Sequence, residues 1–299
     1  MRASAATYAT GTAMSADGTT IGYRRFGEGP GVVLLHGGVN SARHMMKLGR
    51  GLTDAFTVVL PDRRGRGMSG PIGPAYRIER EDEDLAAVVA ATGAQFVFGP
   101  ADGGLFALHG AIGLHRISKV AAYEPLIMAG QPGIEEIRRV FTTMQELVTD
   151  GRVGEAVMFS VHESVLDAAR RGQLPGWLAS LVHRIPVSPT GAALEVLLRL
   201  ERARRGDLSM WDLLVALMPE LDLVMATEGT LEQYRHLEAP ALLLSGSRSD
   251  PIFAASAQAL HGMLPRSTMV RLPGLNHDSA QSYGKPDAIA AALRVFFSS

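Results

Sequence analysis

The chain has 299 residues, with 29 lysines and arginines against 30 aspartates and glutamates, and this near-neutral charge speaks against nucleic-acid binding. It has no cysteine, which excludes disulfides, thiolate metal sites and a cysteine nucleophile. No segment has the apolar length of a signal peptide or of a membrane-spanning helix, so we expect a soluble, cytoplasmic protein with no membrane partner. The sequence does not determine the oligomeric state, and a homo-oligomer is one of the possibilities.

Up to about residue 125, short apolar runs alternate with longer helical stretches. Predicted strands cover residues 9–14, 20–26, 32–35, 57–60, 96–98 and 120–123. The first two flank a Ser-Ala-Asp-Gly turn and predict a β-hairpin. Predicted helices cover residues 42–55, 79–91 and 104–114. Short apolar runs without polar alternation are typical of strands buried on both faces of a parallel sheet, and their alternation with helices indicates βαβ units.

The middle of the chain differs, because residues 129–235 look helical and contain no convincing strand. The first pattern then resumes, with strands at 241–245 and 268–272 and helices at 254–263 and 287–297. We therefore predict an α/β core formed by residues 1–128 and 236–299, with a mostly parallel sheet flanked by helices. Residues 129–235 are predicted to form an inserted helical cap, or lid, over the carboxyl ends of the strands, where parallel sheets bind their ligands.

Five short segments near the predicted strand ends carry a family resemblance. They are residues 36–38, 62–70, 99–104, 246–251 and 274–277. In this order and spacing they resemble the cap-bearing branch of the α/β-hydrolase superfamily over nearly the whole chain. The resemblance implies the α/β-hydrolase fold. It also implies acyl transfer by a serine nucleophile, a histidine base, an acid that orients the histidine, and two backbone N–H groups that hold the oxyanion.

The resemblance assigns these roles to individual residues. His277 matches the base, and Asp250 matches the acid that orients it. The backbone N–H groups of Gly38 and Asp102 match the two donors of the oxyanion hole. The nucleophile position in the Gly-x-Ser-x-Gly-Gly pattern falls on Ala101, whose methyl group cannot attack a carbonyl carbon.

Three explanations of the alanine remain open at this stage. Ala101 is an engineered replacement of a serine, or the chain is a natural variant that works through His277 and Asp250 alone. The latter arrangement resembles cofactor-independent lyases and dioxygenases of the superfamily. The third explanation makes Asp102 the nucleophile on a turn shifted by one residue, similar to the aspartate of epoxide hydrolases.

The predicted function is hydrolysis of an ester or lactone, or cofactor-independent lyase-type chemistry, on a small or medium apolar organic molecule. The alternatives are a non-catalytic small-ligand-binding protein on the same fold and an epoxide hydrolase-like enzyme that uses Asp102. Substrate contacts are predicted for His36, Gly37, His44, Trp177 and Trp211. The remaining histidines lack metal-ligand spacing, so we expect neither a metal nor a cofactor.

Two charged runs are predicted to be structural. Arg63, Arg64 and Arg66 are expected to shape the loop that follows a strand. The acidic run of residues 81–84 is predicted to form a solvated first helical turn that matches the helix dipole, and not a metal site.

Overall fold

The computed structural model describes residues 8–170, 172, 174–205 and 209–299. It divides into two compact units, a core unit of residues up to Pro132 and from Asp222 to Ser299, and a helical unit, Gly133–Leu221. Both ends of the predicted 129–235 segment belong to the core unit. There the Met128 N–H donates to Thr227 Oγ1 at 2.9 Å, and Tyr234 is fully buried. The limits of the helical unit are therefore narrower than those predicted for the cap.

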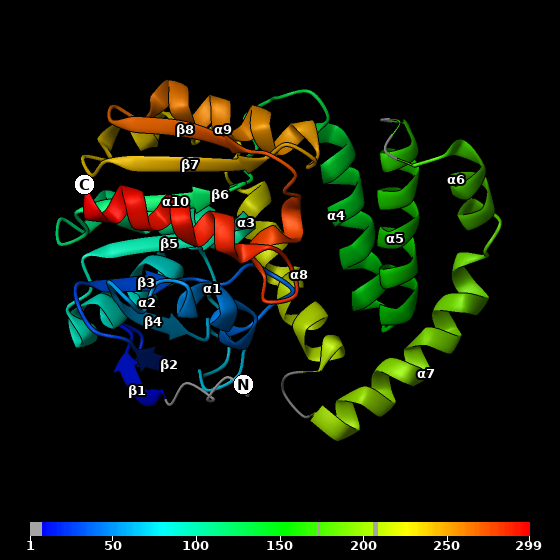
Figure 1. Cartoon of the computed structure of the whole chain (residues 1–299). Helices are drawn as coiled ribbons and strands as arrows, with labels where there is room; N and C mark the ends of the chain where they lie inside the picture. Colours follow the sequence, from blue (N-terminus) through cyan, green and yellow to red (C-terminus); the bar gives the residue numbers. More distant parts are fainter. Residues whose placement is uncertain (1–7, 171, 173, 206–208) are drawn as a thin grey trace, which may run out of the picture. The chain divides into compact units, whose positions relative to one another are not determined.

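A mostly parallel sheet of eight strands runs through the core unit (Figure 1). Its strands are β1 (Ala9–Met14), β2 (Thr20–Phe26), β3 (Gly31–Leu34), β4 (Thr57–Pro61), β5 (Phe96–Pro100), β6 (Lys119–Tyr123), β7 (Ala241–Gly246) and β8 (Ser267–Leu272). They lie in the order β1-β2-β4-β3-β5-β6-β7-β8. The predicted hairpin β1–β2 is antiparallel, β2 is antiparallel to β4, and the other pairs are parallel. The predicted strands are all present, with small differences at their ends.

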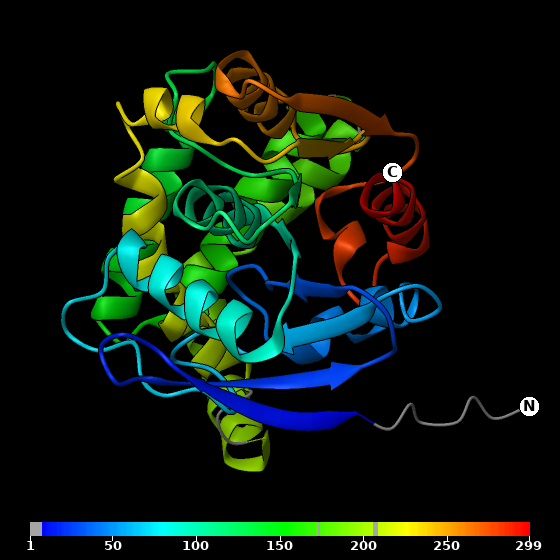
Figure 2. The ribbon, with the colours of Figure 1, turned by 90° about the vertical axis from the view of Figure 1, so that its left-hand side faces the viewer.

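Helices cover both faces of this sheet (Figure 2). One face carries α1 (Met46–Arg50) and α10 (Pro286–Ser298), and the other carries α2 (Ile78–Thr92), α3 (Ala101–Gly113) and α9 (Pro251–Met263). The described part of the core unit also contains the short 3-10 helices η1 (Ala42–Met45), η3 (Leu231–His236) and η4 (His277–Ala280). The helix predicted over 42–55 is wrong in length, because η1 and the short α1 replace it. Gly49 and Gly51 weaken a helix there, and a Cβ on Gly49 would lie 2.9 Å from Cζ of Phe26.

The alternation of side chains along the parallel strands builds two apolar layers. On the face of α1 and α10, Val58, Leu60, Phe96 and Phe98 belong to one buried cluster. The ring of Phe96 stacks on Phe297 of α10, with 4.9 Å between centroids. Full burial of such a side chain contributes about 1.5–3 kcal/mol, so this layer holds the strand ends in a fixed register.

The helical unit contains α4 (Ile134–Thr149), α5 (Val153–Arg170), α6 (Gly176–His183), α7 (Val187–Arg205) and most of α8 (Met210–Met225). α5 and α7 approach closely at Gly154, where glycine has no Cβ. A Cβ at this position would lie 2.0 Å from the carbonyl oxygen of Gly191. Met144, Met218 and Leu221 form a small buried cluster. Among the described residues, no helix is both long and apolar enough to cross a membrane.

Candidate active site

A sharp turn between β5 and α3 places Ala101 above the end of the sheet. Ala101 has φ = 51°, a left-handed conformation that is strained for a residue with a side chain. The turn leaves no room for a side chain at Gly99 or Gly103: a Cβ on Gly99 would lie 2.2 Å from the Gly103 carbonyl oxygen, and one on Gly103 would lie 2.5 Å from the His36 carbonyl oxygen. A strained strand-to-helix turn of this kind exposes its central side chain at the top of the sheet. In this chain that side chain is a methyl group.

His277 stands in a charged and aromatic setting at the start of η4. Its Nδ1 lies 2.8 Å from Oε2 of Glu124, and its ring stacks on Phe253 with 4.1 Å between centroids and an angle of 11°. The His277 side chain keeps 39% of its surface exposed, whereas Glu124 is fully buried. Because a carboxylate accepts at Nδ1, the neutral ring carries its proton there. Nε2 is then the basic nitrogen.

Glu124 was not singled out from the sequence, although it directly follows β6. Tyr123 pairs with Pro100 in the sheet, so Glu124 and Ala101 are the next residues along two neighbouring strands. Glu124 also has a left-handed backbone, with φ = 52°, and its Oε1 accepts from the Gly246 N–H at 2.7 Å. A carboxylate directly after the strand beside the turn is the signal that could have found it.

The structure therefore shows a different carboxylate at His277 from the predicted one. Oδ1 of Asp250 accepts from the Ile252 N–H at 2.8 Å and caps the N-terminus of α9. The contact of His277 Nδ1 with Glu124 differs from the predicted pairing with Asp250, whose role as the orienting acid stays a prediction. The reason is that β6 and β7 lie side by side. Spacing along the chain cannot tell which of the two strand ends reaches the histidine.

Contacts with β6 and β7 hold the loop before His277. The Tyr123 hydroxyl donates to the carbonyl oxygen of Asn276 at 2.6 Å. Burial and the charge of Glu124 raise the pKa of Tyr123, which keeps the phenol protonated as a donor. A Cβ on Gly246 would lie 2.4 Å from the Leu275 carbonyl oxygen, so the loop passes directly over that glycine. The position of His277 is thus set by the backbone as well as by Glu124.

One of the two predicted oxyanion donors, the Gly38 N–H, meets an internal carboxylate. The Gly38 N–H donates to Oδ1 of Asp102 at 2.7 Å, and Nη1 of Arg63 donates to Oδ2 at 3.0 Å. Both oxygens of Asp102 are thereby engaged, which disfavours the predicted alternative of Asp102 as a nucleophile. The backbone N–H of Asp102 lies at the start of α3, where the helix dipole favours negative charge.

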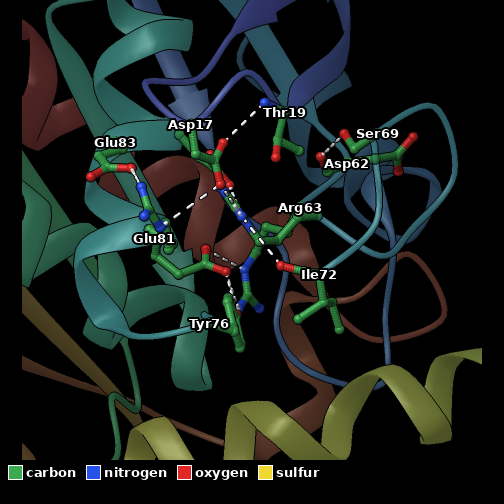
Figure 3. A network of polar contacts seen from close by, with 12 residues as sticks. Asp17, Thr19, Asp62, Arg63, Ser69, Ile72, Tyr76, Glu81 and Glu83 are labelled. Carbon is green, nitrogen blue, oxygen red and sulfur yellow. Dashed lines mark hydrogen bonds and ion pairs between the residues drawn. The ribbon is translucent and has the colours of Figure 1, made fainter. Parts of the chain in front are cut away.

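A buried network of ion pairs fixes the loop after β4 (Figure 3). Arg63 donates to both oxygens of Glu81, at 2.9 and 3.1 Å, and Arg64 donates to both oxygens of Asp84, at 2.7 and 2.6 Å. Arg64 also donates to Asp17 at 3.0 Å. The structural role predicted for the arginines fits these contacts. The solvated turn predicted for residues 81–84 is wrong, because Glu81 and Asp84 are buried against the arginines.

Replacing Glu81 by glutamine is expected to lower the free energy of unfolding by about 3 kcal/mol, because a charge pair that is 2% exposed on both sides loses its strongest hydrogen bonds. Burial raises the pKa of Glu81, but the Arg63 guanidinium lowers it more, so the pKa lies below its usual 4.5. The pair therefore stabilises the fold above pH 4.5, and this contribution is lost as the pH falls through the lower folded value.

Denaturant unfolding at neutral and acidic pH measures the free energy of unfolding and its dependence on pH. The Glu81→Gln variant should lack the part of the acid dependence that comes from Glu81. Glu79→Gln is the matched control, because the Arg77–Glu79 pair is more than half exposed on both sides. Equal losses in the two variants would contradict a special role for the buried pair.

The other predicted substrate contacts have mixed outcomes. His36 is fully buried, its Nδ1 lies 2.9 Å from the Gly37 carbonyl oxygen, and its Nε2 accepts from the Arg63 N–H at 3.0 Å. Burial, with the nearby Arg66 and Arg63 charges, holds the pKa of His36 well below 6.5. The neutral ring of His36 ties two loops together, and its Nδ1–H donates to the Gly37 carbonyl oxygen. These contacts favour a structural role, and the predicted contact of His36 with substrate stays a prediction.

Three further residues were predicted to contact the substrate, and they are divided between the core unit and the helical unit. His44, in η1, is half-buried, and its Nδ1 accepts from the Ser41 N–H at 3.0 Å. Trp177 and Trp211 belong to the helical unit. Trp177 is 70% exposed, and Trp211 is buried beneath the Arg199 guanidinium. Their contacts with substrate stay predictions. Within the described residues, no group of three or more histidines and carboxylates could hold a metal ion.

A histidine–carboxylate pair at the strand ends, next to a strained strand-to-helix turn, defines the class as α/β-hydrolase. The chain belongs to the alpha/beta hydrolase family, whose model matches residues 32–292, and this places it among the hydrolases.

Curated and solved relatives agree with that membership. Pimeloyl-(acyl-carrier protein) methyl ester esterase of Stenotrophomonas maltophilia is 29% identical over 274 residues, which cover 90% of this chain and 93% of that protein. The structure of an alpha/beta hydrolase from Sphaerobacter thermophilus is 30% identical, with a TM-score of 0.63 over 96% of this chain and 100% of that one. Bromoperoxidase from Bacillus anthracis shares the fold, with a TM-score of 0.68 and 18% identity over 98% of this chain and 100% of that one.

Proposed function

We propose that this chain hydrolyses a small or medium apolar ester or lactone, with His277 as general base and Glu124 as the residue that orients it. The observation that carries the proposal is the 2.8 Å hydrogen bond between His277 and the buried Glu124, at the strand end beside Ala101. A binding protein without chemistry has no need for a buried carboxylate that fixes the tautomer of an exposed histidine.

In this proposal Ala101 occupies the nucleophile position, so water takes the place of the serine hydroxyl. His277 Nε2 accepts a proton from the water as its oxygen attacks the carbonyl carbon. The tetrahedral intermediate carries its negative charge on the former carbonyl oxygen, which accepts from the Asp102 N–H at the start of α3. The intermediate then collapses with cleavage of the acyl–oxygen bond. The leaving alkoxide takes the proton back from His277, and the ring is neutral again.

The esterase named among the relatives supports an ester substrate, since it aligns over 90% of this chain at 29% identity. The helical unit, with Trp177 and Trp211, is assigned the role of the cap that surrounds the apolar part of the substrate. Lyase-type chemistry by the same base remains the alternative reaction, and it needs a substrate with an acidic carbon–hydrogen bond in place of an ester.

The proposal is tested by turnover of methyl esters, aryl acetates and lactones in heavy-oxygen water. A single turnover is expected to place the label in the product acid and none in the protein, without a burst of the alcohol product. Label in the Asp102 carboxyl group would instead indicate a covalent aspartyl intermediate. A compound that binds tightly and is never converted, with no ester turned over, would contradict the enzyme and favour the ligand-binding protein.

A further inference from the structure

Resting on the proposed function, we further propose that Asp102 is a positioning residue whose carboxylate withholds the Gly38 N–H from the substrate. The oxyanion-hole donor from the loop after β3, the Gly38 N–H, is then occupied by the Asp102 carboxylate of the protein itself. The developing oxyanion is left with one backbone donor, the N–H of Asp102.

The Gly38 peptide is held from both sides. Its N–H donates to Asp102 Oδ1 at 2.7 Å, which is the short distance typical of a hydrogen bond to a charged acceptor. Its carbonyl oxygen accepts from Nη2 of Arg66, a buried arginine. Releasing the N–H to a substrate therefore requires breaking a charge-assisted bond while Arg66 keeps the peptide in place.

The Asp102 carboxylate is itself anchored by Arg63. Oδ2 of Asp102 accepts from Arg63 Nη1 at 3.0 Å, and the two side chains are 10% and 2% exposed. Arg63 is fixed in turn by the bidentate pair with Glu81 and by the ring of Phe106, 4.5 Å from its guanidinium carbon. Rotating Asp102 away from Gly38 would separate a buried ion pair, so the carboxylate stays on the N–H.

Two consequences follow for the reaction. Loss of one oxyanion donor costs about 10²–10³-fold in kcat, and a neighbouring carboxylate also repels an oxyanion. We therefore expect the substrates to be activated esters and lactones, such as aryl or enol esters. Because their leaving groups depart readily, their hydrolysis depends least on stabilisation of the oxyanion. The chain then differs from a serine-dependent acyl-transfer site at two positions, Ala101 and Asp102. Two differences favour natural divergence over a single engineered replacement of a serine.

The test reads the oxyanion hole without a native substrate. Ala101→Ser supplies a hydroxyl that a fluorophosphonate probe can label, and labelling requires stabilisation of negative charge on the phosphoryl oxygen. We expect slow labelling of Ala101→Ser alone and labelling about 10²-fold faster in Ala101→Ser/Asp102→Ala, because the Gly38 N–H is freed. Arg63 keeps its pair with Glu81 in that variant, so no buried charge loses all of its partners.

Two further readouts separate positioning from a merely structural role. Formate should slow labelling of the double variant by replacing the lost carboxylate, and it should not slow labelling of Ala101→Ser. The amide proton resonance of Gly38 should move upfield on Asp102→Ala as the charged acceptor is lost. Asp102→Val, which keeps most of the volume, replaces the alanine variant if that variant fails to fold.

The outcomes distinguish this inference from the proposed function. Equal labelling rates in the two folded variants, without formate inhibition, would overturn the role of Asp102 and leave the role of His277 intact. No labelling in either variant would overturn both, because the turn at Ala101 would then not present a nucleophile beside His277.

Discussion

Replacement of His277 by alanine is expected to lower kcat for an ester or lactone by about 10²–10⁴-fold, the usual contribution of a positioned general base. The physical reason is that, among the residues that the structure describes, His277 alone is a half-exposed histidine held by a fully buried carboxylate at this strand end. KM should change little, because the imidazole acts on the water and contributes little to binding of the apolar substrate. Steady-state kinetics with an aryl ester measures both constants.

His261→Ala is the matched control for this variant. His261 lies in α9 of the core unit, and its Nδ1 is 2.7 Å from the Ser267 hydroxyl, so it is a hydrogen-bonded histidine outside the site. Its replacement should leave kcat close to the parent value. An unchanged kcat in a folded His277→Ala protein would remove the general base from the mechanism.

Replacement of Glu124 by glutamine is expected to have the second largest effect, a loss in kcat of up to about 10⁴-fold, as when a triad acid becomes an amide. The glutamine oxygen can still accept from the Gly246 N–H, so the fold keeps that bond. Its amide group would then donate toward His277 Nδ1 and force the ring proton onto Nε2. A ring with its proton on Nε2 cannot accept one from water there.

Asp250→Asn provides the comparison that decides between the two carboxylates. The asparagine oxygen can still accept from the Ile252 N–H and cap α9, so we expect a folded protein with kcat near that of the parent. Kinetics of both variants over a range of pH gives the ranking. A severe loss in Asp250→Asn together with a mild one in Glu124→Gln would restore the acid predicted from the sequence.

The sequence by itself was sufficient for the architecture and for part of the site. Apolar runs without polar alternation marked the strands of the parallel sheet, because a strand buried on both faces leaves no position for a polar side chain. The Gly-x-x-x-Gly-Gly spacing around Ala101 marked the strained turn, because only glycines fit where β5, α3 and the His36 loop touch. Both signals are local, and a single stretch of chain carries each of them.

Tertiary structure alone decided which charged groups meet. Glu124 reaches His277 across 153 residues of sequence, and Asp102 reaches Gly38 across 64. The order of the strands in the sheet sets both contacts, and no local pattern encodes it. The acidic run at 81–84 shows the same limit. Its composition resembles a solvated helix start, yet Glu81 and Asp84 are buried against Arg63 and Arg64 and support the loop after β4. Local patterns determine where strands and turns form, whereas the partner of a buried charge depends on which strand ends the packed sheet brings together.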